Sequence, residues 1–213
     1  MSLKSQLDSH KQSFLEKADS KVIEAYDKGV DAVRNSGILD KALKKGDKAK
    51  DFLLKNALSE PIQLSEYLSR GPVVLMWYRG GWCPYCNLEL KAMQDILPEI
   101  NSLGGNLLAL TPELPDKSIS TKEKHLLEFE VLSDVGNRTA WDYGLVFKLH
   151  DDVAKIYAKN FNLQEYNGDN SNELPIAATY VIDKKGTIQY VFLDAEYRNR
   201  AEPEEIIKVL KSL

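Results

Sequence analysis

The chain has 213 residues, of which 43% are hydrophobic and 28% charged, as in globular proteins with one well-packed domain and an extension. Its 28 basic and 32 acidic residues give a net charge of −4, which disfavours nucleic acid as a partner. No apolar run approaches the roughly 20 residues of a membrane span, and the first residues lack the apolar segment of a secretory signal. We therefore expect a cytoplasmic protein that does not bind a membrane.

Residues 1–45 are predicted to form an N-terminal helical extension. Their apolar residues recur three or four positions apart, or at multiples of these, with charged residues between them, up to a break at 35–37. Two interpretations stay open: the helices pack on their own domain, or they form the contact of a homodimer. The positions that define the pattern are Leu3, Leu7, Phe14, Val22, Tyr26, Val30 and Val33.

Residues 46–213 are predicted to form one domain in which buried strands alternate with helices. Continuous apolar runs predict strands that are buried on both faces, and spacings of three and four predict helices. In the first half, the predicted elements are a short strand at 52–54, a short helix at 64–68, strands at 73–78 and 106–110, and between these two strands a helix at 84–103 that Pro98 kinks or breaks.

The second half of this domain ends in a β-hairpin and a helix. The hairpin joins strands at 179–183 and 188–192, and the last helix, at 204–213, follows Pro203. Before them we predict a helix at 120–128, a strand edge at 129–132, a short helix at 139–143 with Trp141 and Tyr143 in the core, and a less periodic insert at 144–174. This order predicts an α/β thioredoxin fold, a central mixed sheet with helices on both faces.

The only two cysteines, Cys83 and Cys86, lie three positions apart where the strand at 73–78 gives way to a helix. At that spacing the two thiols can close a small disulfide ring, and the amides and dipole of a helix N-terminus favour a thiolate. Two cysteines cannot build a structural disulfide framework, so in a reducing compartment the pair is expected to be catalytic. Cys83 comes first in the turn and is expected to be the more exposed sulfur.

The run Trp77-Tyr78-Arg79-Gly80-Gly81-Trp82-Cys83-Pro84-Tyr85-Cys86 resembles the active site of the AhpC/TSA family, a peroxiredoxin-like branch of the thioredoxin superfamily. The resemblance runs from about residue 48 to residue 213, with supporting stretches at 129–134 and 178–183. It implies a peroxidase for hydrogen peroxide or organic hydroperoxides that forms a disulfide between the two cysteines. A thioredoxin-like protein or a small thiol would reduce that disulfide, and no metal or organic cofactor is needed.

Two other functions stay open beside the peroxidase. One is a thiol–disulfide oxidoreductase without peroxidase activity, and the other is a redox-sensing protein whose N-terminal helices engage a partner. A zinc protein is disfavoured, because a zinc site needs about four ligands and the three histidines are widely separated.

Two alignments of the cysteine pair with its relatives also stay open. As in thioredoxins, Cys83 would be the nucleophile and Cys86 its resolving partner. In the peroxiredoxin register, which Glu89 sets, Cys86 takes the peroxidatic position, and Cys83 and Arg79 replace the threonine and the proline of that family.

A further position of the family is altered near the strand at 179–183. Ala177 stands where the resemblance predicts the peroxiredoxin arginine or the thioredoxin cis-proline, and Pro175 comes two residues too early to replace it. Arg138 is a candidate for the missing arginine, although a place on a helix surface is favoured.

Five more residues are expected to shape the site. Arg79 either lowers a thiol pKa or lies on the surface. Glu89 either relays a proton to the second cysteine or is an ordinary helix carboxylate. Trp82, Pro84 and Tyr85 are expected to surround the cysteines, and simple packing is the alternative role for Trp82 and Tyr85.

Overall fold

The apolar runs form the centre of a mixed sheet. The computed structural model describes residues 2–213, and within this range the main sheet has seven strands in the order β2-β1-β5-β4-β3-β8-β9. Strands β3, β4 and β5 are parallel, whereas β1, β2, β8 and β9 pair with their neighbours in antiparallel fashion. These strands are β1 (Leu53–Asn56), β2 (Pro61–Gln63), β3 (Val73–Trp77), β4 (Asn106–Thr111), β5 (Glu130–Ser133), β8 (Ala178–Ile182) and β9 (Ile188–Leu193).

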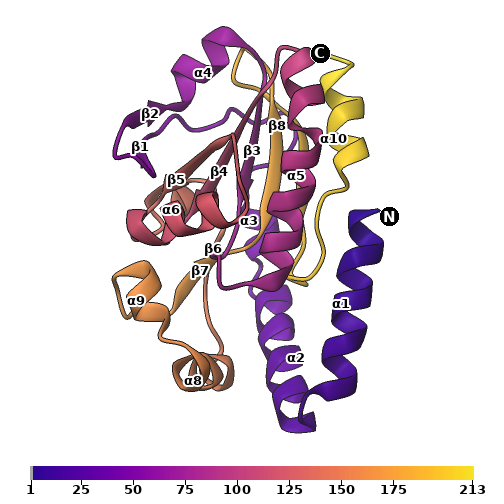
Figure 1. The fold of residues 1–213 in the computed structure, drawn as a ribbon, viewed down its shortest axis with the longest axis vertical. Coiled ribbons are helices and arrows are strands. Elements are labelled where there is room, and N and C mark those ends of the chain that lie inside the picture. The colour runs from indigo at the N-terminus through magenta and orange to yellow at the C-terminus, as the bar shows by residue number, and fades with distance from the viewer. Residues whose placement is uncertain (1) are drawn as a thin grey trace.

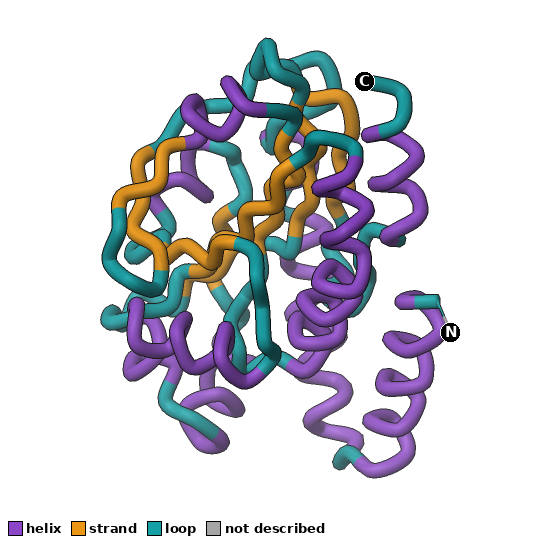
Figure 2. Tube along the Cα trace, turned by 45° about the horizontal axis from the view of Figure 1, so that its top comes forward, coloured by secondary structure: helices purple, strands orange, loops and turns teal. Residues whose placement is uncertain are grey.

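Helices cover both faces of this sheet (Figure 1), and Figure 2 shows the strands enclosed between them. They are α1 (Leu3–Lys17), α2 (Ser20–Asn35), α3 (Ile38–Lys41), α4 (Leu64–Arg70), α5 (Pro84–Ser102), α6 (Pro115–Lys124), α7 (Arg138–Asp142), α8 (Asp151–Asn160), α9 (Leu163–Asn167) and α10 (Pro203–Leu210). A small second sheet pairs β6 (Val146–Lys148) with β7 (Glu173–Pro175). The predicted thioredoxin fold, with helices at its N-terminus, is confirmed.

The side chains of β3 point alternately to the two faces of the sheet and so contribute to two layers of the hydrophobic core. Val74 and Met76 pack with α1, α5 and α10 on one face of the sheet. Val73, Leu75 and Trp77 pack with α3, α4 and α7 on the other. Successive side chains of a strand point to opposite faces, so a strand buried on both must be apolar throughout, as this one is. The carboxyl end of β3 is thereby fixed between the two layers, and the cysteine turn follows it.

Helices α1 and α2 form an antiparallel pair that extends below the sheet (Figure 1). Leu3 and Leu7 of α1 enter the same core layer as α5, and Ala25, Val30 and Val33 of α2 are buried. The N-terminal helices therefore pack on their own chain, which is one of the two interpretations of their apolar stripe. A homodimer contact through them stays a prediction.

Several elements differ from their predicted positions. Helix α6 begins at Pro115 and ends at Lys124, not at 120–128, because proline at the first helical position starts the helix earlier. Helix α5 continues through Pro98 instead of breaking there. The insert at 144–174, which has little periodicity, contains β6, α8, α9 and β7. Trp141 is 54% exposed, so its predicted core position is wrong, whereas Tyr143 is fully buried.

None of the helices within residues 2–213 combines the length and the apolar character that crossing a bilayer requires.

Candidate active site

The two cysteines lie where β3 ends and α5 begins. Cys83 is the N-cap residue of α5, Pro84 is at its first helical position, and Cys86 is in its first turn. Two glycines make the turn before them feasible. Gly80 has φ +154°, and a Cβ on Gly81 would lie 2.0 Å from Oγ1 of the buried Thr121. The backbone therefore passes closer to α6 than any larger residue would allow, and this brings both sulfurs into the core.

Both sulfurs are buried, Cys83 at 2% exposure and Cys86 at 0%, and both are free thiols. Cys83 is the more exposed of the two, as expected, but only slightly, because aromatic residues and helix α1 pack over the turn. The Tyr85 ring packs edge-on against His10 of α1 at a centroid distance of 4.9 Å. Trp82 packs against Phe161, after the end of α8, at 4.8 Å. Trp82 and Tyr85 thus lie beside the cysteines, as predicted for residues that shape the site.

Arg79 lies on the Cys83 side of the pair and is 3% exposed, so it is not a surface arginine. Its Nη1 is 4.0 Å from the Cys83 sulfur, and its Nη2 donates a hydrogen bond to the Tyr157 hydroxyl. The guanidinium lies 4.4 Å from the ring centre of Tyr197 and 5.1 Å from that of Trp82. Within residues 2–213 no carboxylate forms an ion pair with it. An aromatic surrounding attracts the cation without neutralising its charge.

Arg200 lies on the Cys86 side, and there the environment is different. Its Nη2 donates to the Cys86 sulfur at 3.3 Å, and its Nε donates to the Glu89 carboxylate at 2.5 Å. Both Arg200 and Glu89 are almost completely shielded from solvent. Burial raises the pKa of Glu89 to about 7, against the opposing effect of the arginine charge. When Glu89 is ionised, it offsets the charge that Arg200 presents to Cys86.

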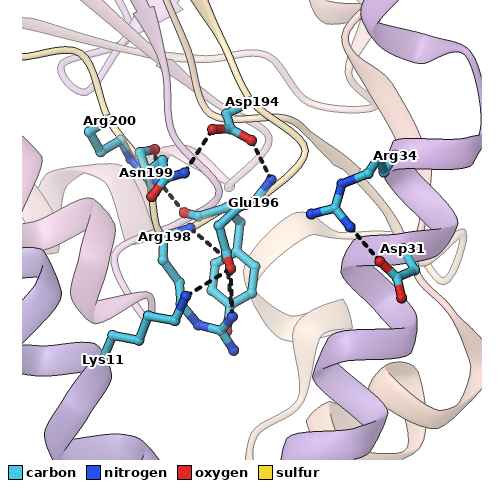
Figure 3. A network of polar contacts seen from close by, with 9 residues as sticks. Lys11, Asp31, Arg34, Asp194, Glu196, Arg198, Asn199 and Arg200 are labelled. Carbon is cyan, nitrogen blue, oxygen red and sulfur yellow. Dashed lines mark hydrogen bonds and ion pairs between the residues drawn. The ribbon is translucent and has the colours of Figure 1, made fainter.

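The loop at 194–200, which carries Arg200, is held together by a network of polar contacts (Figure 3). Asp194 accepts hydrogen bonds from the backbone N–H of Glu196 at 2.8 Å and from the Asn199 amide at 2.7 Å. The Glu196 carboxylate accepts from Arg198 at 3.0 Å and pairs with Lys11 of α1 at 3.2 Å. The loop that carries the arginine of Cys86 is therefore tied to the first helix of the chain.

These charges have opposite effects on the two thiols. Burial raises the pKa of Cys83, but the hydrogen bond from Cys86 and the charges of Arg79 and Arg200 outweigh it and lower this pKa to about 5. Burial and the neighbouring Cys83 raise the pKa of Cys86 well above its ordinary value. The closest cation contact is nevertheless at Cys86. After burial, the largest contribution to this separation comes from the hydrogen bond between the two sulfurs, which lowers the pKa of Cys83 and raises that of Cys86.

A second buried carboxylate, Glu113, lies at the same edge of the sheet. One of its oxygens accepts a hydrogen bond from the backbone N–H of Gly81 at 3.0 Å and lies 3.4 Å from Oγ1 of Thr111. Burial raises the pKa of Glu113 to about 7, although the bond from Gly81 lowers it. Glu113 therefore fixes the turn before the cysteines and can carry a proton at neutral pH.

The altered position at Ala177 has no direct substitute in the strand that follows it. Ala177 is buried, and residues 2–213 contain no cis peptide bond, so the cis-proline of thioredoxins has no counterpart here. Arg138 is exposed at the start of α7, which agrees with its favoured place on a helix surface. The arginine next to Cys86 is Arg200, from a loop between β9 and α10. No group of three or more side chains suited to hold a metal ion occurs within residues 2–213.

Sequence analysis missed several residues of the site. Glu113 was detectable in principle, because it follows β4, and parallel neighbours β3 and β4 end at the same edge of the sheet. Arg200, Tyr157 and Tyr197 had no such signal, since they are between 71 and 117 positions from the cysteines along the chain and only the tertiary fold brings them close.

Comparisons with known proteins agree with this architecture. The AhpC/TSA family profile matches residues 45–191. Chloroplastic peroxiredoxin Q of Oryza sativa subsp. japonica is 27% identical over 173 residues, which cover 79% of this chain and 67% of that protein. Chloroplastic peroxiredoxin Q of Sedum lineare is 26% identical over 185 residues, which cover 85% of this chain and 84% of the relative.

Among solved structures, the peroxidoxin BcpB of Mycobacterium tuberculosis superposes with a TM-score of 0.64 at 21% identity, over 80% of this chain and 98% of that one. Peroxiredoxin Q of Xanthomonas campestris superposes with a TM-score of 0.57 at 13% identity, over 76% of this chain and 90% of that one. At these identities the superpositions establish a common fold. Because the family profile spans more than half of the chain, the protein belongs to the AhpC/TSA family, within the thioredoxin superfamily.

Proposed function

We propose that the protein is a thiol peroxidase in which Cys83 attacks the peroxide and Cys86 resolves the product. The observation that supports this most directly is a buried thiol pair in which one sulfur faces an arginine that forms no ion pair with a carboxylate of residues 2–213. The names of the peroxiredoxin relatives point to the same chemistry. Arg79, Trp82, Pro84, Tyr85 and Glu89 are proposed to shape this site.

The proposed cycle begins with the Cys83 thiolate, which attacks the terminal oxygen of a hydroperoxide. The O–O bond breaks, Cys83 becomes a sulfenic acid, and the leaving alkoxide or hydroxide takes up a proton. The Cys86 thiol then displaces water from the sulfenic acid and forms the disulfide. Two thiols are oxidised, and one peroxide is reduced to an alcohol and water, or to two waters when it is hydrogen peroxide. A thioredoxin-like protein or a small thiol restores the pair by thiol–disulfide exchange.

Stopped-flow mixing of the reduced protein with hydrogen peroxide tests this function. We expect rapid loss of both thiols in the wild type, and a trapped sulfenic acid on Cys83 in the Cys86→Ser variant. A sulfenic acid on Cys86 in the Cys83→Ser variant, with none in Cys86→Ser, would reverse the assignment. A rate no faster than that of a free thiol would refute the peroxidase.

A thiol–disulfide oxidoreductase is the second candidate, favoured by the altered threonine and arginine positions of peroxiredoxins, Cys83 and Ala177. Turnover in an insulin-reduction assay, with no acceleration by peroxide, would support it. The deep burial of both sulfurs limits access by a large protein disulfide and by a thioredoxin-like reductant alike, so it does not separate the two candidates.

Four further points belong to the same proposal. We divide the chain into a helical extension at residues 1–45 and an AhpC/TSA domain at 46–213, which the family match from residue 45 onward supports. A thioredoxin-like reductant, a cytoplasmic location and a homodimer through α1 and α2 are predictions that reduction assays, cell fractionation and solution mass measurements would test.

A further inference from the structure

A groove separate from the cysteine site lies between the second sheet and the N-terminal helices. Its space accessible to water is about 290 Å³. Residues 144–148, which include β6, line one side, and α3 with the end of α2 lines the other. The residues that surround the two sulfurs are not among those that line it. A function of this groove would therefore be distinct from the chemistry of the cysteine pair.

Trp141 of α7 lines this groove and is 54% exposed. Every other tryptophan, tyrosine and phenylalanine of residues 2–213 is buried or half-buried. Beside Trp141, Val33 of α2 and Ile38 of α3 contribute apolar side chains to the groove. An indole ring buries a large area when a partner covers it, and tryptophan is enriched among the residues that contribute most to binding at interfaces. The exposed indole over apolar neighbours is thus a suitable anchor for a binding partner.

The strand β6 adds main-chain hydrogen-bonding groups to the same groove. At its end, the N–H of Leu149 donates to the C=O of Asn172 at 2.9 Å. Alternate residues of an antiparallel pair bond to the neighbouring strand, so the N–H and C=O groups of Val146 and Lys148 point away from β7. No turn or loop of residues 2–213 forms a main-chain hydrogen bond with these groups. β6 therefore has a free edge to which another strand can add.

The charge that lines the groove is entirely positive. Lys41 and Lys148 are the charged residues among its lining, and neither forms an ion pair within residues 2–213. Carboxylates are the complementary groups for two unpaired lysines. A second copy of β6 would bring a further Lys148 to the same place, and lysine on an edge strand disfavours such self-pairing. The charge thus favours an acidic segment of a different protein.

We propose that this groove binds an extended acidic peptide of a partner protein, which adds to β6 as a strand. The proposal goes beyond the peroxidase and does not depend on it. Hydrogen bonds to the main chain of Val146 and Lys148 would hold the peptide, an apolar side chain would cover Trp141, and carboxylates would face Lys41 and Lys148. Because β6 has only three residues, the added strand is short and the complex is expected to be weak and reversible.

Binding of capped, fluorescent hexapeptides to the full-length protein tests the proposal. The probe alternates glutamate with valine, and a second peptide has lysine in place of glutamate. Two further probes carry N-methyl groups on the odd or on the even amides, so that only one of them loses the donors that face β6. We expect saturable binding of the acidic probe, none of the lysine peptide, and selective loss with one N-methylated form. No binding of the acidic probe up to about 1 mM would overturn the proposal.

Variants of the protein locate the binding. Trp141→Ala should weaken it about tenfold, and Lys148→Glu about fivefold or more. Lys159→Glu makes the same charge change at an exposed position of α8, outside the groove, and should leave the affinity unchanged. Thermal unfolding verifies that each variant is folded. If the three variants bind alike, the peptide does not bind in this groove and the assignment fails.

Amide hydrogen exchange of the wild type tests the strand addition without any variant. The N–H groups of Val146 and Lys148 should exchange rapidly in the free protein and more slowly with the acidic probe bound. Unchanged exchange, or N-methylated forms that bind equally, would mean that the peptide does not extend β6. Sedimentation velocity tests the remaining occupant. A dimer of the free protein that Trp141→Ala abolishes would make the groove a contact between copies and overturn the proposal.

Discussion

The two sulfurs of the cysteine pair lie within one turn of each other but beside two differently paired arginines. On the Cys86 side, Arg200 contacts the sulfur at 3.3 Å and shares its charge with Glu89. On the Cys83 side, Arg79 is farther away, at 4.0 Å, and is surrounded by aromatic rings. Each arginine has the larger cationic effect on its own sulfur, yet only the pKa of Cys83 is lowered. The nearest cation is thus a poor guide to a thiol pKa when burial and the hydrogen bond to a second thiol are ignored.

The largest expected effect comes from replacing either cysteine with serine. Cys83→Ser should reduce peroxide turnover by roughly 10⁴-fold or more, the order seen when a covalent nucleophile is removed. Cys86→Ser should also stop turnover but leave one rapid reaction per molecule, which sulfenic-acid trapping detects. If both variants lose the rapid reaction equally, the comparison between the two sides does not hold.

Replacing Arg200, the arginine paired with Glu89, should have the next largest effect, which is a loss of unfolding free energy. Arg200→Met leaves Glu89 buried without its cation, which costs about 3 kcal/mol of unfolding free energy or more. Urea unfolding at pH 8 measures this loss. The control is Arg138→Met, an exposed arginine whose replacement should change stability by less than about 0.5 kcal/mol. A loss as small as that of the control would mean that the ion pair is not intact in solution.

Removing the unpaired arginine should instead affect reactivity. Arg79→Met takes away the charge that favours the Cys83 thiolate, so the pKa of Cys83 should rise from about 5 towards that of a free thiol. At pH 7 the thiolate fraction, and the alkylation rate with it, then falls, by up to roughly 30-fold if the pKa reaches that of a free thiol. The pH profile of iodoacetamide alkylation measures this shift. Arg79→Lys keeps the charge and should retain most of the reactivity. A profile unchanged in Arg79→Met would remove Arg79 from the explanation.

The smallest expected effect is on the pH dependence of stability. It comes from Glu113, a buried carboxyl group that, unlike Glu89, forms no ion pair with an arginine within residues 2–213. Its pKa is raised to about 7, so the folded state keeps a proton that the unfolded state loses above pH ~4.5. Wild-type stability should therefore fall as pH rises from ~4.5 to 7, and Glu113→Gln should remove this part of the loss. At pH 7.5 we expect a gain of about 1 to 2 kcal/mol over wild type, and almost none at pH 4.5.

Glu89→Gln is the matched variant. It removes a similarly raised pKa but also leaves Arg200 without a carboxylate, so its gain at pH 7.5 should be smaller than that of Glu113→Gln. Chemical denaturation of both variants at pH 4.5 and 7.5 measures these changes in unfolding free energy. If the two glutamine variants behave alike, the distinction between paired and unpaired carboxyl groups is wrong.

The parts of the fold that the sequence predicts well are those with one dominant local signal. β3, β4 and the hairpin of β8 and β9 are buried on one or both faces and have long apolar runs, so their type and approximate bounds follow from pattern alone. Prediction was poorer between residues 115 and 175, where Pro115 moves a helix start and short elements carry little periodicity. Trp141 shows why an aromatic residue alone does not predict the core, since the side chain is exposed.

The site divides in a similar way. Cys83, Cys86 and Glu89 belong to one turn and helix, so their mutual placement follows from spacing. The position left open at Ala177 could not be resolved from the sequence, because the arginine beside Cys86 comes from residue 200, after the hairpin. The burial of Cys83 was also missed, since it depends on how α1 packs over the turn.

The short distance along the chain between the sulfurs has a consequence for oxidative damage. A sulfenic acid is lost irreversibly when a second peroxide oxidises it further before a thiol reaches it. Here the second thiol is three residues away in the first turn of the same helix, so the competing reaction is intramolecular and benefits from a high effective concentration. In the proposed cycle, the position that is a threonine in peroxiredoxins supplies the attacking sulfur, and its neighbour gives this chain a built-in resistance to inactivation by excess peroxide.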